Sequence, residues 1–389
     1  MAFNKKTIKD IDVNGKTVLV RASLNVPIKN NKVVDDLRLK ALLPTLKYLL
    51  DKKAKLVLMS HHSSDGQSLA PVAPVLTDLL SLPVKFVDDS VGPKVAEAVK
   101  SLKPGQVMVL ENLRFHKGEE ANDPVYVKKL AALGDAYVDD DFTATHREHA
   151  SVVGIPKLLP GVAGLQILQE VDTITKAMEN PKRPLLVVVG GTKISTKIDF
   201  LDNFIKKAQA IFIGGAMANT FLGAQGLEVG KSLVEESEYK TAQKVMALAR
   251  DRDVQLFLPI DVVVTDDLDK ATKVRVVAAN QIGKSDIVAD LGPRSVAAIQ
   301  SVLNKKGTVI WNGPLGVAEI SAFAKGSKDI AKRITDSGAT SIVGGGDTAG
   351  FIDSIGWHDK FSFISTGGGA SLELMSGKKL PGVEALLDK

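Results

Sequence analysis

The sequence predicts an α/β protein with two doubly wound parallel sheets, and three observations lead to this prediction. Short apolar runs alternate with amphipathic helical patterns along the chain, which is typical of parallel sheets with right-handed crossovers. The alternation starts again after a stretch rich in proline and glycine near the middle. A length of 389 residues also exceeds what one hydrophobic core usually serves.

The first half is expected to hold four strands and one clear helix. The apolar runs lie at 17–21, 54–59, 106–110 and 135–138, and the helical pattern covers 38–51. Polar side chains follow these runs, namely Asn25, His61, Arg114, and three aspartates that precede Arg147. Because ligands of doubly wound sheets bind at the carboxyl ends of the strands, these residues are candidates for binding.

The second half is expected to repeat this arrangement. Its strands are predicted at 185–189, 210–213, 255–258, 308–311, 341–343 and 361–364. A helix is predicted at 165–179, between two stretches that contain proline, and we interpret it as a connector. The expected domains are therefore 1–160 and 185–379, with the connector helix and hinge at 161–184.

The second half is organised around the stretch 185–200. An apolar run typical of a strand buried on both faces breaks at Gly190-Gly191, where the chain can turn sharply. A helical pattern then begins, with Lys193 and Lys197 four residues apart and so expected on one face of its first turns. A strand, a glycine turn and a helix N-terminus with lysines form an anion site suited to a polyphosphate. The alternative is a plain tight turn with two solvated lysines, since neither a Walker A loop nor a dinucleotide-binding turn is present.

Glycine turns follow five of the predicted strands in the second half. They contain Gly190-Gly191, Gly214-Gly215, Asn312-Gly313-Pro314, Gly344-Gly345-Gly346 and Gly367-Gly368-Gly369. One such turn is routine packing, but five at the carboxyl ends of one sheet indicate an open backbone surface for a large, flat anionic ligand. We therefore expect a nucleotide site in this half.

Composition narrows the classes of function. The 50 basic and 45 acidic residues are interspersed, without a basic tail or stripe, so we expect no nucleic-acid partner. The absence of cysteine excludes disulfides, thiolate metal sites and a cysteine nucleophile. The start of the chain lacks the apolar core of a signal peptide, and no apolar run is long enough to span a membrane. The expectation is therefore a cytoplasmic protein without membrane contact.

Nine segments together resemble the phosphoglycerate kinase family, and the likeness covers essentially the whole chain. They are NLRFHKGEEANDP, HREHAS, VVGGTKISTKI, FIGGAMANTFL, LPIDVVV, ADLGP, TVIWNGPLGVAE, IVGGGDTAG and ISTGGGASLELMSGKKLPGV. The resemblance implies two doubly wound domains that face each other across a cleft and close about the connecting helix. The first would bind 3-phosphoglycerate or its acyl phosphate and be completed by residues 380–389. The second would bind Mg²⁺ with ATP or ADP.

The resemblance also implies roles for residues of the second half. Lys193 and Lys197 would hold the terminal phosphates and the phosphoryl group in flight, and Gly368 and Gly369 would present amides to it. Asp347 would hold Mg²⁺, although without the resemblance it fits a helix N-cap equally well. Further implied nucleotide contacts are Gly190, Gly191, Gly214, Gly215, Gly292, Asn312, Pro314, Glu319, Gly345, Gly346 and Thr348.

The implied nucleotide half differs only mildly from the family pattern. Gly214 and Gly215 would let the flat base approach the backbone, and Glu319 would accept from the ribose hydroxyls. Without the resemblance, Glu319 would be taken as a solvated surface carboxylate. Ala216 replaces a glycine of the family, and Asn219 replaces an aromatic residue.

The larger departures lie in the implied acceptor pocket. Its residues would be Ser23, Asn25, Arg38, His61, Ser64, Arg114 and Arg147. Ser23 stands where the family has the aspartate that holds the glycerate hydroxyl, and Ser64 where it has an arginine. Thr143 replaces a glycine, and the carboxylates of Asp65 and Asp141 are expected to repel an anionic substrate. These changes predict that 3-phosphoglycerate binding is weakened about a hundredfold or more.

Three functions stay open at this point. The first is in-line phosphoryl transfer of the phosphoglycerate kinase type, with a weakened acceptor site and no covalent nucleophile. The second is a kinase of the same fold that takes another, less anionic acceptor. The third is a catalytically silent nucleotide-binding protein, against which Arg38 argues, because in the family it stabilises the migrating phosphoryl group. A monomer is expected, and His116, His149 and His358 are expected to be structural.

Overall fold

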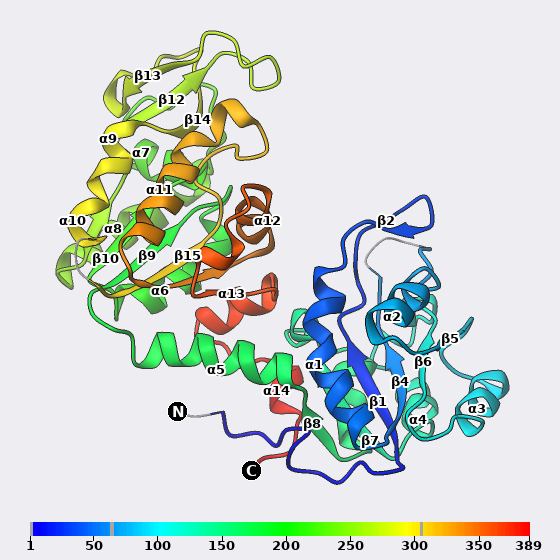
Figure 1. Cartoon of the computed structure of the whole chain (residues 1–389). Helices are drawn as coiled ribbons and strands as arrows, with labels where there is room; N and C mark the ends of the chain where they lie inside the picture. The colour runs from blue at the N-terminus through cyan, green and yellow to red at the C-terminus, as the bar shows by residue number, and fades with distance from the viewer. Residues whose placement is uncertain (1–2, 63–65, 304–305) are drawn as a thin grey trace. The chain divides into compact units, whose positions relative to one another are not determined.

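The structure is a computed structural model that describes residues 3–62, 66–303 and 306–389. It divides into two compact units, of which unit 1 comprises Met1–Asp172 and Lys379–Lys389, and unit 2 comprises Thr173–Lys378. Helix α5 (Leu165–Glu179) begins in unit 1 and ends in unit 2. Both ends of the chain belong to unit 1 (Figure 1).

Unit 1 is built on a six-stranded sheet in which neighbouring strands are parallel. In sheet order, the strands are β5 (Val84–Val87), β6 (Val107–Leu110), β4 (Lys55–Met59), β1 (Thr17–Ala22), β7 (Ala136–Asp140) and β8 (Gly161–Ala163). The helices are α1 (Leu37–Asp51), α2 (Val72–Leu80), α3 (Pro93–Lys100), α4 (Pro124–Ala131) and α14 (Pro381–Glu384). The strand order runs outward from β1 in both directions, which confirms the predicted doubly wound sheet.

The apolar pattern of α1 explains how this helix packs against the sheet. Leu39, Leu42, Leu46 and Leu49 recur at helical spacing and are completely buried. They belong to one hydrophobic core with Val18 of β1 and with residues of α2. All residues of β1 are buried, as expected of a central strand covered on both faces.

Unit 2 is built on a second six-stranded parallel sheet. In sheet order, the strands are β11 (Gln255–Phe257), β10 (Ala210–Ile213), β9 (Leu185–Val189), β15 (Thr308–Asn312), β16 (Thr340–Gly344) and β17 (Phe363–Ile364). The helices are α6 (Ile198–Ile205), α7 (Met217–Ala224), α8 (Tyr239–Asp251), α9 (Pro293–Ala298), α10 (Gln300–Leu303), α11 (Lys325–Asp336), α12 (Gly346–Ser354) and α13 (Gly369–Met375). The order again runs outward in both directions from β9 and β15, which confirms the second doubly wound sheet.

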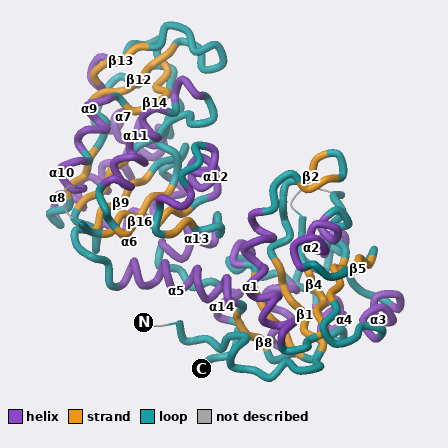
Figure 2. The backbone as a smooth tube through the Cα atoms, in the orientation of Figure 1, coloured by secondary structure: helices purple, strands orange, loops and turns teal. Residues whose placement is uncertain are grey.

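Several strands of the structure were not predicted. An antiparallel sheet in unit 2 has the order β13 (Arg275–Ala278), β12 (Asp261–Thr265) and β14 (Ile287–Leu291), and Figure 2 shows it at one end of that unit. A hairpin of β2 (Ile28–Lys29) and β3 (Lys32–Val33) lies in unit 1, where β5 and β8 were also missed. Strands β2, β3, β5, β8 and β13 are short or half-exposed, so they carry little periodic apolar signal, whereas β12 and β14 are five residues long and largely buried.

No helix in the described ranges is both long and apolar enough to cross a membrane.

Candidate functional site

The two lysines of the 185–200 stretch are placed differently from the prediction. Lys193 is exposed and precedes a 3₁₀ turn at Ser195–Lys197, and α6 begins only at Ile198. The lysines therefore do not stack on the first turns of a helix. The turn intervenes because the carboxylate of Glu235 holds Ser195, accepting from its hydroxyl at 2.7 Å and from its backbone N–H at 3.2 Å.

Lys197 points instead to the end of the neighbouring strand β15. Its half-buried ammonium donates to the side-chain oxygen of Asn312, the last residue of that strand. Burial lowers the pKa of Lys197 to about 8, and the charge of Asp347 partly opposes this shift. The side chain is therefore largely charged at neutral pH, and it is held where an anion could meet it.

Glycine at the ends of β9, β10 and β15 is required by the packing of the turns on one another. A Cβ on Gly190 would lie 2.0 Å from the carbonyl oxygen of Pro314, and one on Gly313 would lie 2.2 Å from that of Gly190. Gly215 has a φ of +66°, and a Cβ there would approach the backbone of Gly191 to 2.7 Å. The five predicted turns follow β9, β10, β15, β16 and β17, which are adjacent strands of one sheet. The structure thus gathers them at one edge.

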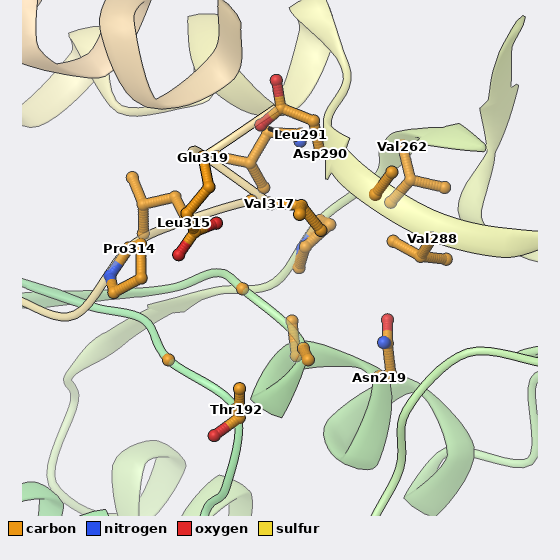
Figure 3. Close-up of a pocket in the computed structure, with 17 residues that line it drawn as sticks. Thr192, Asn219, Val262, Val288, Asp290, Leu291, Pro314, Leu315, Val317 and Glu319 are labelled. Atoms are coloured by element: carbon orange, nitrogen blue, oxygen red, sulfur yellow. Dashed lines mark hydrogen bonds between the residues drawn. The ribbon is translucent and has the colours of Figure 1, made fainter. Parts of the chain in front are cut away.

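A cavity of about 170 Å³ lies beside these turns in unit 2 (Figure 3). Predicted nucleotide residues that line it are Gly191, Gly215, Pro314 and Glu319. Its apolar walls come mainly from the small sheet and the loop after β15, through Val262, Val288, Leu291, Leu315 and Val317. Flat apolar walls beside an anion-binding edge suit a nucleobase.

Gly214 and Gly292, which were predicted to contact the nucleotide, do not line this cavity. Gly214 is buried, and a Cβ there would lie 2.7 Å from the side chain of Leu315, so loop packing accounts for it. Gly292 is buried at the start of α9, and a Cβ there would lie 2.3 Å from the carboxylate carbon of Asp261. Of the Gly214-Gly215 pair, only Gly215 is placed to contact a ligand in the cavity.

Two polar residues of the cavity wall, Asp290 and Asn219, were not among the predicted nucleotide contacts, although Asn219 was noted as the replacement of an aromatic residue. Burial raises the pKa of Asp290 to about 7, and its oxygens accept backbone N–H groups of Gly326 and Leu291 at 2.6 and 2.8 Å. Both residues lie in segments that resemble the family, ADLGP and FIGGAMANTFL. The orientation of their side chains, however, depends on the loops that pack around them. No sequence pattern gave that orientation.

The end of β16 brings four more predicted residues to the same edge. Gly345 has a φ of +98° and Gly346 opens α12, where added side-chain atoms would meet open space. Asp347 lies exposed in the first turn of α12. Thr348 is fully buried and its hydroxyl oxygen accepts the Gly313 N–H at 2.8 Å, so it fixes the turn after β15.

The residues around Asp347 fit a hard divalent cation bound together with phosphates. Its carboxylate makes no hydrogen bond or ion pair with the described residues, and its charge acts on Lys197. Within the described ranges, no group of three or more His, Asp or Glu could hold a metal by itself. Mg²⁺ commonly takes one or two carboxylates and completes its shell with water and substrate phosphates.

The N-terminus of α13 carries the remaining predicted glycines of unit 2. Gly368 precedes the helix with a φ of +52°, a left-handed conformation that favours glycine, and Gly369 is its first residue. A Cβ on Gly368 would meet nothing within 4 Å. The backbone here is open to a ligand.

In unit 1, positive charge gathers at the carboxyl end of the sheet. His61 is buried after β4, and burial together with the charges of Arg21, Arg114 and Arg147 pushes its pKa well below the usual range. It is therefore neutral, and its Nδ1 accepts from the Arg21 guanidinium at 2.7 Å. Burial also lowers the pKa of Arg114, partly opposed by Glu120 at 2.9 Å and reinforced by Arg147.

His149, expected to be structural, belongs to this cluster. Burial and the charges of Arg147 and Arg114 lower its pKa to about 4, so it is uncharged at neutral pH. In the sequence, the sign of this placement was that His149 belongs to the HREHAS segment, two residues after Arg147.

Arg38 and Asn25 line a separate groove of about 440 Å³ in the same unit. Arg38 lies in the first turn of α1, and its guanidinium donates to the carbonyl oxygen of Asn25 at 2.6 Å. His62 and Gln67 also line this groove, whereas Arg114 and Arg147 do not.

The structure corrects the expectation for Asp141. Its carboxylate accepts from the Arg21 guanidinium at 2.7 Å, both side chains are completely buried, and Thr143 donates to its second oxygen at 2.5 Å. A charge paired in this way does not repel an anion in the groove. Ser23 is also completely buried, and its hydroxyl has no hydrogen-bond partner among the described residues. Ser64 and Asp65 lie outside the described residues.

Comparison with known proteins gives one consistent result. A model of the family described as "Phosphoglycerate kinase" matches residues 8–378. The chain is 46% identical to a phosphoglycerate kinase of Dictyoglomus turgidum and 44% identical to one of Moorella thermoacetica, over 99% of this chain and 100% of each relative. It is similar in structure to phosphoglycerate kinase from Coxiella burnetii, with a TM-score of 0.88, 37% identity and 98% of both chains covered. For the enzyme from Pyrococcus horikoshii OT3, the TM-score is 0.84 at 30% identity and the same coverage.

Proposed function

The chain belongs to the phosphoglycerate kinase family and is a phosphotransferase with a carboxyl acceptor, and from this premise we propose its reaction. It transfers a phosphoryl group between ATP and the carboxylate of 3-phosphoglycerate, forming ADP and 1,3-bisphosphoglycerate, and the reverse reaction serves glycolysis. The observation that carries the proposal is the set of turns after β9, β15 and β16. They bring Lys193, Lys197 and Asp347 to one edge of a sheet, beside an apolar cavity.

In this proposal, unit 2 binds the nucleotide. The base enters the cavity, Glu319 accepts from the ribose, and the turns at Gly190-Gly191 and Gly345-Gly346 face the phosphates. Lys193 and Lys197 neutralise the terminal phosphates as point charges. Since Lys197 is fixed by Asn312, its charge is already placed before the substrate arrives.

Asp347 would hold Mg²⁺, which when bound neutralises charge on the nucleotide's phosphates. The open backbone at Gly368 and Gly369 would donate N–H groups to the phosphoryl group in transfer. Phosphoryl transfer asks mainly for positioning and charge neutralisation, and these residues supply both.

Unit 1 binds the acceptor in the proposal, with Arg38, Arg114 and Arg147 as its cations. Binding is weaker than the family pattern would give, because Ser64 replaces an arginine. Losing one charge-assisted hydrogen bond costs about 1.5–3 kcal/mol, or roughly a factor of 10 to 100 in affinity. Asp141 adds nothing to this loss, since Arg21 neutralises it.

The same proposal assigns residues 1–160 and 380–389 to acceptor binding and 185–379 to nucleotide binding. It describes a monomer that works on small molecules in the cytoplasm. The connector and hinge would be residues 161–184, which include α5.

The test is ATP consumption with Mg²⁺ and 3-phosphoglycerate, measured for the wild type and for Arg38→Ala. Lys40→Ala is the matched control, because it removes a positive charge from the same helical turn outside the groove. The proposal predicts turnover that Arg38→Ala abolishes and Lys40→Ala keeps. No turnover, with normal Mg-ADP binding by calorimetry, would favour a kinase with another acceptor or a silent nucleotide-binding protein.

A further inference from the structure

Asn219 carries a buried hydrogen-bond acceptor that no described residue uses. It lies in the first turn of α7, is 1% exposed and lines the unit 2 cavity. Figure 3 shows its side chain rising from α7 towards Val288. Its Nδ2 donates to the carbonyl oxygen of Leu233 at 3.0 Å, whereas its Oδ1 has no donor among the described residues. A buried acceptor without a donor costs free energy, and a ligand that donates to it recovers this cost.

The orientation of the amide is determined by this contact. Because a carbonyl oxygen can only accept, the nitrogen of Asn219 must be the atom that faces Leu233. The oxygen is then the atom left for the cavity.

The other polar side chains that line the cavity are mainly hydrogen-bond acceptors as well. Asp290 already accepts two backbone N–H groups, and Glu319 is a further acceptor. Thr192 belongs to the turn after β9, at the phosphate end of the site. The remaining lining is apolar or glycine. A base with ring carbonyls would lose their hydration here, and the side-chain donors left for it are the Thr192 hydroxyl, at the phosphate end, and the protonated fraction of Asp290.

We propose that Asn219 determines the choice of base, its Oδ1 accepting a hydrogen bond from the exocyclic amino group of adenine. Adenine has that amino group and no ring carbonyl, which matches a cavity with apolar walls and a buried acceptor that no described residue pairs. The inference rests on the proposed nucleotide site and adds a specificity residue to it. The family pattern has an aromatic residue at this position, so this contact would belong to this chain's own sequence.

A purely structural role for Asn219 is the competing explanation. Its bond to Leu233 and the bond from Glu235 N–H to the Thr220 hydroxyl at 3.1 Å both hold the same loop against α7. Glu235 in turn holds Ser195, between the two lysines. Loosening this loop would weaken binding of any nucleotide, whatever its base, whereas loss of a base contact would change only the preference between bases.

The experiment compares ADP with purine riboside 5′-diphosphate, which lacks only the amino group. Their dissociation constants are measured with Mg²⁺ by calorimetry on the full chain. The wild type should bind ADP about tenfold more tightly, which corresponds to about 1.4 kcal/mol. In Asn219→Leu this ratio should fall below about two. Thr220→Val, the matched control, loosens the same loop and should leave the ratio near ten.

Each other outcome is decisive. If the wild type binds both diphosphates equally, the inference is wrong while the proposed function stands, and this comparison needs no variant that must fold. If Asn219→Leu weakens both ligands by the same factor, Asn219 only holds the loop. If neither diphosphate binds, the proposed nucleotide site itself fails. Tryptophan fluorescence during heating confirms that each variant is folded, since Trp311 and Trp357 both lie in unit 2.

Discussion

Replacing Asp141 by alanine should destabilise unit 1 through the charge that it leaves behind. Arg21 and Asp141 are both completely buried and meet at 2.7 Å. Removing one partner of a buried pair costs about 3–5 kcal/mol, because the other charge stays in a poorly solvated place. Arg21 keeps its bonds to His61 and to the hydroxyl of Ser151, and Glu119 and Asp139 still act on it. We therefore expect the lower end, about 3 kcal/mol.

For a domain of this size, about 3 kcal/mol lowers the unfolding temperature by roughly 6–12 °C. Differential scanning calorimetry should show the shift, while tryptophan fluorescence should change little, because both tryptophans belong to unit 2. Thr143→Val is the matched control, since it removes only the hydroxyl that donates to Asp141, at a cost of about 1 kcal/mol.

A loss below about 1 kcal/mol in Asp141→Ala would refute the reasoning. It would mean that Glu119 and Asp139 already balance the charge of Arg21.

The remaining predictions concern the lysine turn, the start of α5 and the packing of the glycine turns. Burial lowers the pKa of Lys197 to about 8, so Mg-ADP affinity should fall as the pH rises through 8. Lys197→Arg should move that fall to higher pH, and a flat wild-type profile in calorimetry would contradict this. Asp140 accepts the backbone N–H of Gln166, at the start of α5, at 2.9 Å, and burial raises its pKa to about 7, above its ordinary 3.8. Folding therefore favours the protonated form, and stability should decline as the pH rises from about 4 to 7. Asp140→Asn should remove the share of this decline that Asp140 contributes, about 4 kcal/mol at most. The shares of Asp139 and Asp290, whose pKa values burial also raises, should stay, and equal pH slopes of wild type and variant in urea denaturation would count against the prediction. Gly190→Ala places a Cβ 2.0 Å from the Pro314 carbonyl oxygen, so thermal unfolding of unit 2 should show a loss of about 2 kcal/mol, and an unchanged midpoint would disprove the packing argument.

The parallel sheets could be predicted because their strands are apolar on both faces. The run at 185–189 has the bounds of β9, and the pattern at 165–179 has those of α5. The small sheet could not be predicted in the same way. Its strand β13 (Arg275–Ala278) has two exposed residues followed by two half-buried ones, a pattern that does not distinguish a strand from a loop.

The sequence could predict the part of the candidate site that lies at the carboxyl ends of the strands. The glycine turns and Asp347 lie where a doubly wound sheet places the carboxyl ends of its strands. The pairing of Arg21 with Asp141 was not predictable, since it joins residues 120 positions apart. The orientation of Asn219 likewise depends on the carbonyl of Leu233, fourteen residues away.

The most direct test of the proposed reaction is to trap its product. The protein is incubated with Mg²⁺, ATP, 3-phosphoglycerate and hydroxylamine, which converts an acyl phosphate into a hydroxamate. Transfer to the carboxylate predicts one hydroxamate for each ADP formed, and neither product in Arg38→Ala. Formation of ADP without hydroxamate would contradict a carboxyl acceptor and with it the proposed function.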